Sequence, residues 1–86
     1  MQKLEKSLKA MANRRRLAIL QYLKENKEAS VGDIAEKIRL SFNATSKHLK
    51  VLYAADIVDR EQRSLQMYYK LAYTQSLAAK HILSIL

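Results

Sequence analysis

The fold is decided by the stretch Leu40-Ser41-Phe42-Asn43-Ala44-Thr45-Ser46-Lys47-His48-Leu49-Lys50-Val51-Leu52. Ser41 directly precedes a helical pattern and predicts an N-cap, with the helix running to about Ala55. At about 100° per residue, one face collects the side chains that can seat this helix on a core: Thr45, Leu49 and Leu52. The opposite face collects polar and cationic side chains: Asn43, Lys47 and Lys50, flanked by Ala44, Ser46 and Val51. On residue types alone, this outward face suits either reading DNA or ordinary solvation.

Three helices are expected before this stretch. The first is indicated by apolar residues at i, i+4 and i+7, namely Leu4, Leu8 and Met11. The second is expected to start at Arg14, behind the cap Asn13, and to end at about Glu25. The third is expected over residues 31–38, where Ser30 and Asp33 resemble a shortened capping box. Residues 26–29 between them are expected to be a polar break.

After the stretch, the spacing of apolar residues changes from helical to alternating. In residues 65–71 apolar side chains alternate with polar ones, which is typical of a half-buried strand. Residues 57–71 as a whole predict a hairpin that turns near Gln62-Arg63-Ser64. Thr74 can then cap a last helix that runs to Leu86.

Length and composition fit one domain. A chain of 86 residues allows a single compact core. The absence of proline and the single glycine favour helices with short connections. The expected fold is therefore mainly α with a small β-hairpin wing (α+β). It is a winged helix-turn-helix in the order α-α-α-α-β-β-α, in one domain over residues 1–86.

The positive charge of the chain is clustered. The formal net charge is +8, and residues 1–16 hold six Lys and Arg against one acid. Residues 41–55 hold two lysines and no acid. Clustered positive charge attracts polyanions, which are nucleic acids or anionic membrane surfaces. A membrane role is disfavoured because the basic stretches border core-type helices and do not form one basic amphipathic helix.

The central stretch, together with Ala54-Ala55-Asp56-Ile57-Val58, resembles the recognition-helix signature of the ArsR family of winged-helix repressors. Residues 8–20 are similar to the opening of that family's second helix, and Tyr68-Tyr69-Lys70-Leu71 resembles the end of its wing. The resemblance covers residues 4–71. It implies sequence-specific binding of double-stranded DNA by a homodimer that represses transcription. The side chains that it places in or beside the major groove are Ser41, Asn43, Ser46, Lys47 and Lys50.

Three features within this region allow two interpretations each. Phe42 stands where the family often has a polar residue, and we expect it to staple the helix start to the core rather than to touch a thymine methyl. His48 matches a common family histidine and borders the core face, so it is expected to be structural rather than to contact a base. Arg14-Arg15-Arg16 open a helix, where the macrodipole disfavours cations. Either nearby carboxylates pair with them or they contact phosphate, and Arg16, which matches a family position, is expected to be structural.

The hairpin carries a weaker signal for DNA. Arg60 and Arg63 indicate contact with the DNA backbone or the minor groove. Asp59 and Glu61 beside them dilute this charge, and the turn lacks the glycine that such wings usually carry.

The two ends of the chain hold more apolar surface than we expect a core of this size to bury. Packing on the protein's own core is one interpretation. The resemblance implies the other, in which residues 1–12 and 73–86 are dimerisation helices that set two recognition helices about one DNA turn apart. The residues expected at this interface are Leu4, Leu8, Met11, Leu77, Ile82 and Ile85.

Other classes of function are disfavoured. The lack of cysteine excludes a disulfide, a thiolate metal site and a cysteine nucleophile, and His81 has no second metal ligand within a helical turn. No glycine-rich phosphate loop or catalytic set can be assembled, so neither an enzyme nor a cofactor is expected. With no apparent signal peptide or membrane span, a cytoplasmic protein is expected. The alternative function is a winged-helix interaction module whose basic face binds an acidic protein partner.

Overall fold

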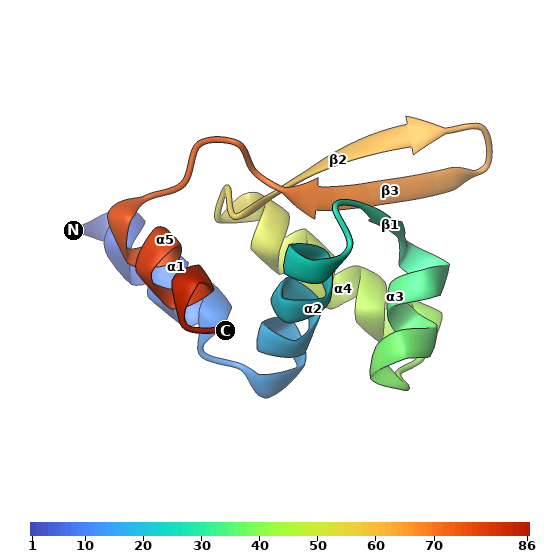
Figure 1. Ribbon diagram of the computed structural model, residues 1–86, viewed down its shortest axis with the longest axis horizontal. Helices are drawn as coiled ribbons and strands as arrows, with labels where there is room; N and C mark the ends of the chain where they lie inside the picture. The colour runs from blue at the N-terminus through green and yellow to red at the C-terminus, as the bar shows by residue number, and fades with distance from the viewer.

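The structure, a computed structural model, describes all residues from 1 to 86. Figure 1 shows helices and a small sheet in the order expected from the sequence, with one short strand added. The elements are α1 (Gln2–Met11), α2 (Arg14–Glu25), β1 (Ala29–Ser30), α3 (Val31–Ile38), α4 (Phe42–Ala54), β2 (Val58–Arg63), β3 (Gln66–Leu71) and α5 (Leu77–Ser84). The mainly α chain with a β-hairpin is confirmed.

Side-chain caps explain where four of the helices begin. Asn13 Oδ1 accepts hydrogen bonds from the backbone N–H groups of Arg15 and Arg16 at 2.9 and 3.1 Å. Ser30 and Ser41 each accept one bond at 3.1 Å at the starts of α3 and α4, as expected from the sequence. These contacts satisfy backbone donors that a helix start leaves unpaired.

The expected start of the last helix is wrong. The cap is Ser76, whose Oγ accepts from the Ala79 N–H at 3.1 Å, and α5 ends at Ser84 rather than at the last residue. Thr74 lies in the irregular connection between β3 and α5, which the next residue, Gln75, fastens to the body of the protein. The Gln75 Nε2 group donates to the carbonyl of Ile57 at 2.8 Å, so the chain turns into a helix only after this contact.

The sheet has three antiparallel strands in the order β1-β3-β2. β2 and β3 form the hairpin, in which Arg63 pairs with Gln66. The turn is therefore Ser64-Leu65, later than expected, and Ser64 takes the positive φ of 54° that a two-residue turn needs at its first position. The alternating pattern places Leu65 in the half-buried strand, but this residue lies at the tip and is 96% exposed.

The strand β1 is not expected from the sequence. Ala29 pairs with Tyr69 and is buried, although the sequence predicts a polar break over residues 26–29. A strand of two residues is too short to show alternation, so only its pairing with β3 reveals it. This pairing joins the start of α3 to the wing.

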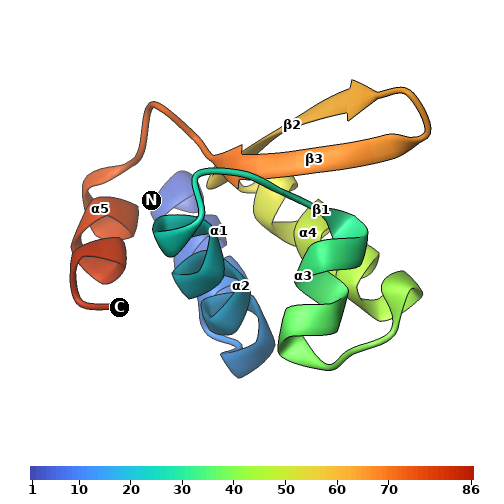
Figure 2. The same ribbon diagram turned by 45° about the vertical axis from the view of Figure 1, so that its right-hand side comes forward.

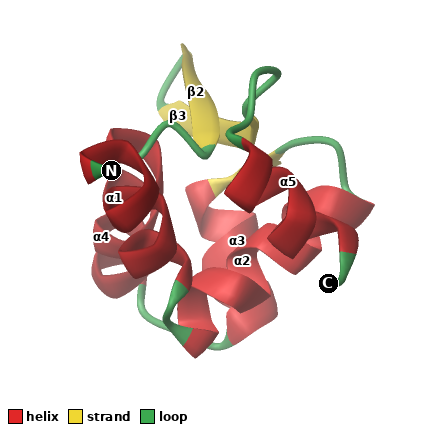
Figure 3. Ribbon diagram, turned by 90° about the vertical axis from the view of Figure 1, so that its left-hand side faces the viewer, coloured by secondary structure: helices red, strands yellow, loops and turns green.

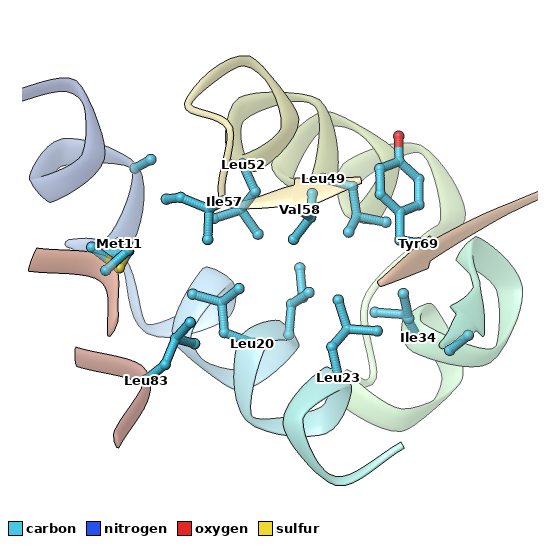
Figure 4. Close-up of a cluster of buried hydrophobic side chains, with 14 of the residues drawn as sticks. Met11, Leu20, Leu23, Ile34, Leu49, Leu52, Ile57, Val58, Tyr69 and Leu83 are labelled. Carbon is cyan, nitrogen blue, oxygen red and sulfur yellow. The ribbon is translucent and has the colours of Figure 1, made fainter. Parts of the chain in front are cut away.

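The core lies where all five helices meet the base of the hairpin. Figure 4 shows its side chains converging from the helices and the strands, among them Met11, Leu20, Leu23, Ile34, Leu49, Leu52, Ile57, Val58, Tyr69 and Leu83. Met11 is only 4% exposed. The expectation that Met11 contributes to a dimer surface is therefore wrong, because the protein's own core already covers it.

The molecule is elongated, with principal extents of 36, 23 and 22 Å. The wing projects at one end, and α1 and α5 lie together at the other (Figures 1 and 2). Lys24 Nζ on α2 donates to the carbonyls of Leu83 and Leu86 at 2.8 and 3.3 Å, which ties the end of α5 to the body. No helix combines the length and the apolar character that crossing a membrane requires.

Candidate nucleic-acid interface

The helix α4 packs by one face and exposes the other. Thr45, Leu49 and Leu52 are fully buried, as the sequence predicts. On the opposite face the side chains of Asn43, Lys47 and Lys50 are exposed, together with Ser41 at the helix start. Ser46 lies on the flank of this face and is half-buried. The structure thus brings the five expected α4 residues to one side of the molecule.

This face carries positive charge and no negative charge. The helix α4 contains no Asp or Glu, and neither of its lysines takes part in an ion pair. Ser41 Oγ accepts a bond from the Ala44 N–H at 3.1 Å, which leaves its hydroxyl proton available as a donor. Amide, hydroxyl and ammonium groups are the side-chain types that contact base edges and phosphates.

A polar brace behind α4 fixes its position against α1 and α2. The Arg16 guanidinium donates to the carbonyls of Lys9 and Ala10 at the end of α1, and its Nη1 lies 3.2 Å from Nδ1 of His48 on α4. Burial, and then the charges of Arg16 and Arg15, lower the pKa of His48. Because a guanidinium can only donate, Nδ1 of His48 accepts this bond, and both residues hold helices together, as expected.

Two of the arginines that open α2 contact carbonyl groups at the ends of other helices and not carboxylates. Arg15 Nη1 donates to the carbonyl of Ile38 at 3.4 Å, at the end of α3, just as Arg16 reaches the end of α1. Cations are stabilised at helix C-termini, which counters their unfavourable place at the start of α2. Arg14 is exposed and makes no ion pair. Of the three, it is the one left available to phosphate.

The two wing arginines differ in what they contact. Arg63 forms a two-pronged ion pair with Glu28 at 2.6 and 2.9 Å and a further contact with Glu61 at 3.0 Å. These bonds raise the pKa of Arg63 and lower the pKa of Glu28. Arg60 has no carboxylate partner, and its guanidinium carbon lies 4.0 Å from the ring centroid of Tyr53. Arg60 is thus held beside α4 with its charge uncompensated.

Sequence reasoning missed both wing contacts. Glu28 and Arg63 are 35 residues apart, and Tyr53 and Arg60 lie on different elements. Only β1, which draws the loop before α3 alongside β3, brings Glu28 to the wing. No local pattern in the sequence could have indicated either pair.

The expectation for Phe42 is wrong. Instead of packing on the core, its side chain is 59% exposed at the start of α4. Phe42 is the first helical residue after the cap, and the side chains beside it, Val31, Leu65 and Met67, cover its ring only in part.

Apolar side chains remain exposed at the end of the molecule opposite the wing, which Figure 3 brings to the front. Leu4 and Leu8 on α1 are about half covered, whereas Leu77 at the start of α5 and Ile85 just after its end are 86% and 68% exposed. Ile82 is half-buried against the core. The structure therefore keeps five of the six expected interface residues at least partly accessible.

Nowhere in the molecule do three His, Asp or Glu side chains converge so that they could hold a metal ion.

Comparison with known proteins gives a consistent set of relatives. The model of a helix-turn-helix domain family matches residues 11–61. The chain is 41% identical over 68 residues to the transcriptional activator HlyU of Vibrio cholerae, covering 79% of this chain and 62% of that protein. It is 31% identical to the arsenical resistance operon repressor of Bacillus subtilis, covering 83% and 68% of the two chains. The chain thus spans less than two thirds of the HlyU sequence.

Solved structures agree with these matches. Reduced HlyU from Vibrio cholerae superposes with a TM-score of 0.83 at 37% identity, covering 98% of this chain and 84% of that one. The homodimeric winged helix-turn-helix DNA-binding domain of Mb0332 from Mycobacterium bovis, a possible ArsR-family regulator, gives 0.83 at 25% identity, covering 98% and 74%. The winged helix-turn-helix fold is confirmed.

Proposed function

The chain belongs to the ArsR family of winged helix-turn-helix transcriptional regulators, and on this premise we propose that it binds a palindromic promoter site in double-stranded DNA as a homodimer. In this role it acts in the cytoplasm and represses transcription by covering the promoter. The whole chain, residues 1–86, serves as one DNA-binding domain. No catalytic step is part of the proposal.

The single observation that carries the proposal is the outward face of α4. It presents Asn43, Lys47 and Lys50 without any acidic neighbour on the helix, on an element seated firmly by buried residues. A rigid helix with polar side chains at its exposed start and cations further along can enter the major groove, where the base edges are distinguishable. In the proposal Asn43 and Ser46 contact bases, and Ser41, Lys47 and Lys50 contact bases or phosphates.

The wing contributes through Arg60. The Tyr53 ring already positions its guanidinium. Because Arg60 has no carboxylate partner, it can contact a phosphate without first breaking an ion pair. Arg63 is not part of the proposed contact surface, because two carboxylates already neutralise its charge.

Dimerisation uses the exposed apolar side chains of residues 1–12 and 73–86. Leu4, Leu8, Leu77, Ile82 and Ile85 would be buried against the second copy, which explains their accessibility in one chain. A two-fold dimer places its two recognition helices about 34 Å apart, so the expected site has half-sites separated by about one helical turn of DNA.

The experiment compares two substitutions on duplexes selected by the protein from a random pool. Asn43→Ala should cost about 1–3 kcal/mol on the selected duplex and little on a scrambled one, because base contacts discriminate. Lys50→Ala should weaken binding to both and lower the slope of log affinity against log salt by about 0.9 for each phosphate that the variant no longer neutralises. A run-off transcription assay on the selected site then measures repression.

Both side chains are exposed, so the variants should keep the circular dichroism spectrum and melting temperature of the wild type. If neither substitution alters binding in folded protein, the proposed face is wrong. Binding that shows no preference for any duplex sequence would instead favour the interaction module, in which the basic face meets an acidic protein.

A further inference from the structure

Phe42 is a large apolar side chain exposed within the candidate interface. It lies seven residues before Leu49, and therefore on nearly the same helical face, yet Leu49 is fully buried and Phe42 is 59% exposed. Two turns of helix separate the two, and at the first residue of α4 the neighbouring side chains cover the ring only in part. Ser41 and Asn43 on either side are exposed as well. The ring therefore lies on the surface that we propose faces DNA.

A small notch lies beside the ring, between the starts of α3 and α4 and the tip of the wing. Its volume is about 110 Å³, and its apolar lining comes from Val31, Phe42, Leu65 and Met67. Small-molecule sites usually enclose about 300–1,000 Å³, so this notch is too small for a whole ligand. It can accept only an apolar edge or a methyl group of a larger partner.

The charge of the helix that carries Phe42 indicates that partner. The residues that line the notch are uncharged, and the helix has exposed lysines and no acid, so the ring lies at the start of a cationic helix suited to a polyanion. In the major groove of DNA, the one apolar group at the base edges is the C5-methyl group of thymine. Phenylalanine is among the side chains that contact this methyl.

We propose that Phe42 reads the C5-methyl group of one thymine in each half-site. The inference rests on the proposed DNA binding and adds a specificity-determining residue to it. Asn43 is the next residue along the helix, and an asparagine amide pairs with both edge atoms of adenine, N6 and N7. The half-site is therefore expected to contain both a thymine and an adenine within reach of the first turn of α4.

The test removes the methyl group alone. In the duplex selected from a random pool, each thymine of a half-site is replaced in turn by deoxyuridine, and affinity is measured for the wild type and for Phe42→Ala. The wild type should weaken by about fourfold at one position in each half-site, which corresponds to one buried methyl. Phe42→Ala should bind the thymine and uracil duplexes equally, and Phe42→Leu should retain part of the discrimination.

Val51→Ala is the matched control, since Val51 is another exposed apolar residue of α4 and lies more than two turns further along. This variant should discriminate between the duplexes as the wild type does. Sequence-specific binding with no effect of uracil at any position would overturn the inference and leave the proposed function standing. So would discrimination that survives Phe42→Ala, or a lower sedimenting mass for this variant, which would assign the notch to a second copy of the chain. Absence of any sequence-specific binding would overturn both.

Discussion

The two arginines of the wing should contribute differently to the salt dependence of DNA binding. Arg60 stacks on Tyr53 at 4.0 Å and has no carboxylate partner. Arg63 is bound at 2.6 to 3.0 Å by two carboxylates. Counting formal charges, the cluster of Arg63 with Glu28 and Glu61 is one positive against two negative, a net −1. Such a cluster releases no counterion from DNA, whereas a free guanidinium on a phosphate does.

The expected magnitude follows from counterion release. Each phosphate neutralised on duplex DNA adds about 0.9 to the slope of log affinity against log salt, so Arg60→Ala in a dimer should lower the slope by about 1.8. Over a fourfold range of salt, from about 50 to 200 mM, this difference amounts to about twelvefold in affinity. Arg63→Ala should leave the slope unchanged. Arg60→Lys should keep the slope, because the charge remains, while it loses the flat stacking on the ring.

The assay is fluorescence anisotropy of a labelled selected duplex, titrated with each variant at several salt concentrations. Lys80→Ala is the control, since this exposed lysine on α5 lies at the opposite end of the molecule from the wing. Equal slopes for the wild type and Arg60→Ala would refute the reasoning. An equal reduction for Arg60→Ala and Arg63→Ala would also refute it, since it would show that the ion pairs of Arg63 open on DNA.

Three further outcomes are expected. Leu8→Glu places a charge in the proposed apolar interface, so it should convert the dimer to a folded monomer in sedimentation at micromolar concentration. A wild type that already sediments as a monomer would contradict that interface. The buried Thr45 hydroxyl has no hydrogen-bond partner. Thr45→Val should therefore raise the free energy of unfolding by about 1 kcal/mol, or the melting temperature by about 4–8 °C. A lower melting temperature would show that the hydroxyl does form a hydrogen bond. His48 has a lowered pKa in the folded state, so unfolded chains bind more protons and stability should fall as the pH drops from about 6.5 through the lowered value. Urea unfolding at pH 7.5 and 5.5 should show this loss in the wild type and less of it in His48→Gln, whose amide oxygen can still accept from Arg16; an equal loss in both would assign the effect to other groups.

The helical part of the fold was predictable because its signals are local. The caps Asn13, Ser30 and Ser41 and the helical spacing of apolar residues place three helix starts correctly, since a cap bonds a backbone group only two or three residues away. The buried face of α4 follows from the helical period alone. The start of the last helix is ambiguous in the sequence because two hydroxyl residues, Thr74 and Ser76, precede it. A contact with Ile57, far away in sequence, selects the second.

The candidate site divides in the same way. The residue types and spacing in positions 41–50 determine which α4 side chains point outward, because one helix face must bury its apolar residues. The same helical pattern predicts the wrong burial for Phe42 and Met11. Phe42 repeats the position of buried Leu49 but stays exposed at the first residue of α4, whereas Met11 repeats the stripe of Leu4 and Leu8 but reaches into the core.

Sequence by itself therefore determined the order of the elements, their caps and the composition of the DNA-facing helix, all of which depend on interactions within a few residues. Tertiary structure alone decided how far the core extends along each helix and that β1 pairs with β3. It also decided that Glu28 neutralises Arg63, whereas Arg60 stacks on Tyr53 without a carboxylate partner. Those features depend on contacts between residues distant along the chain. The sign of a surface charge can be read from composition, but whether a partner already neutralises it depends on packing.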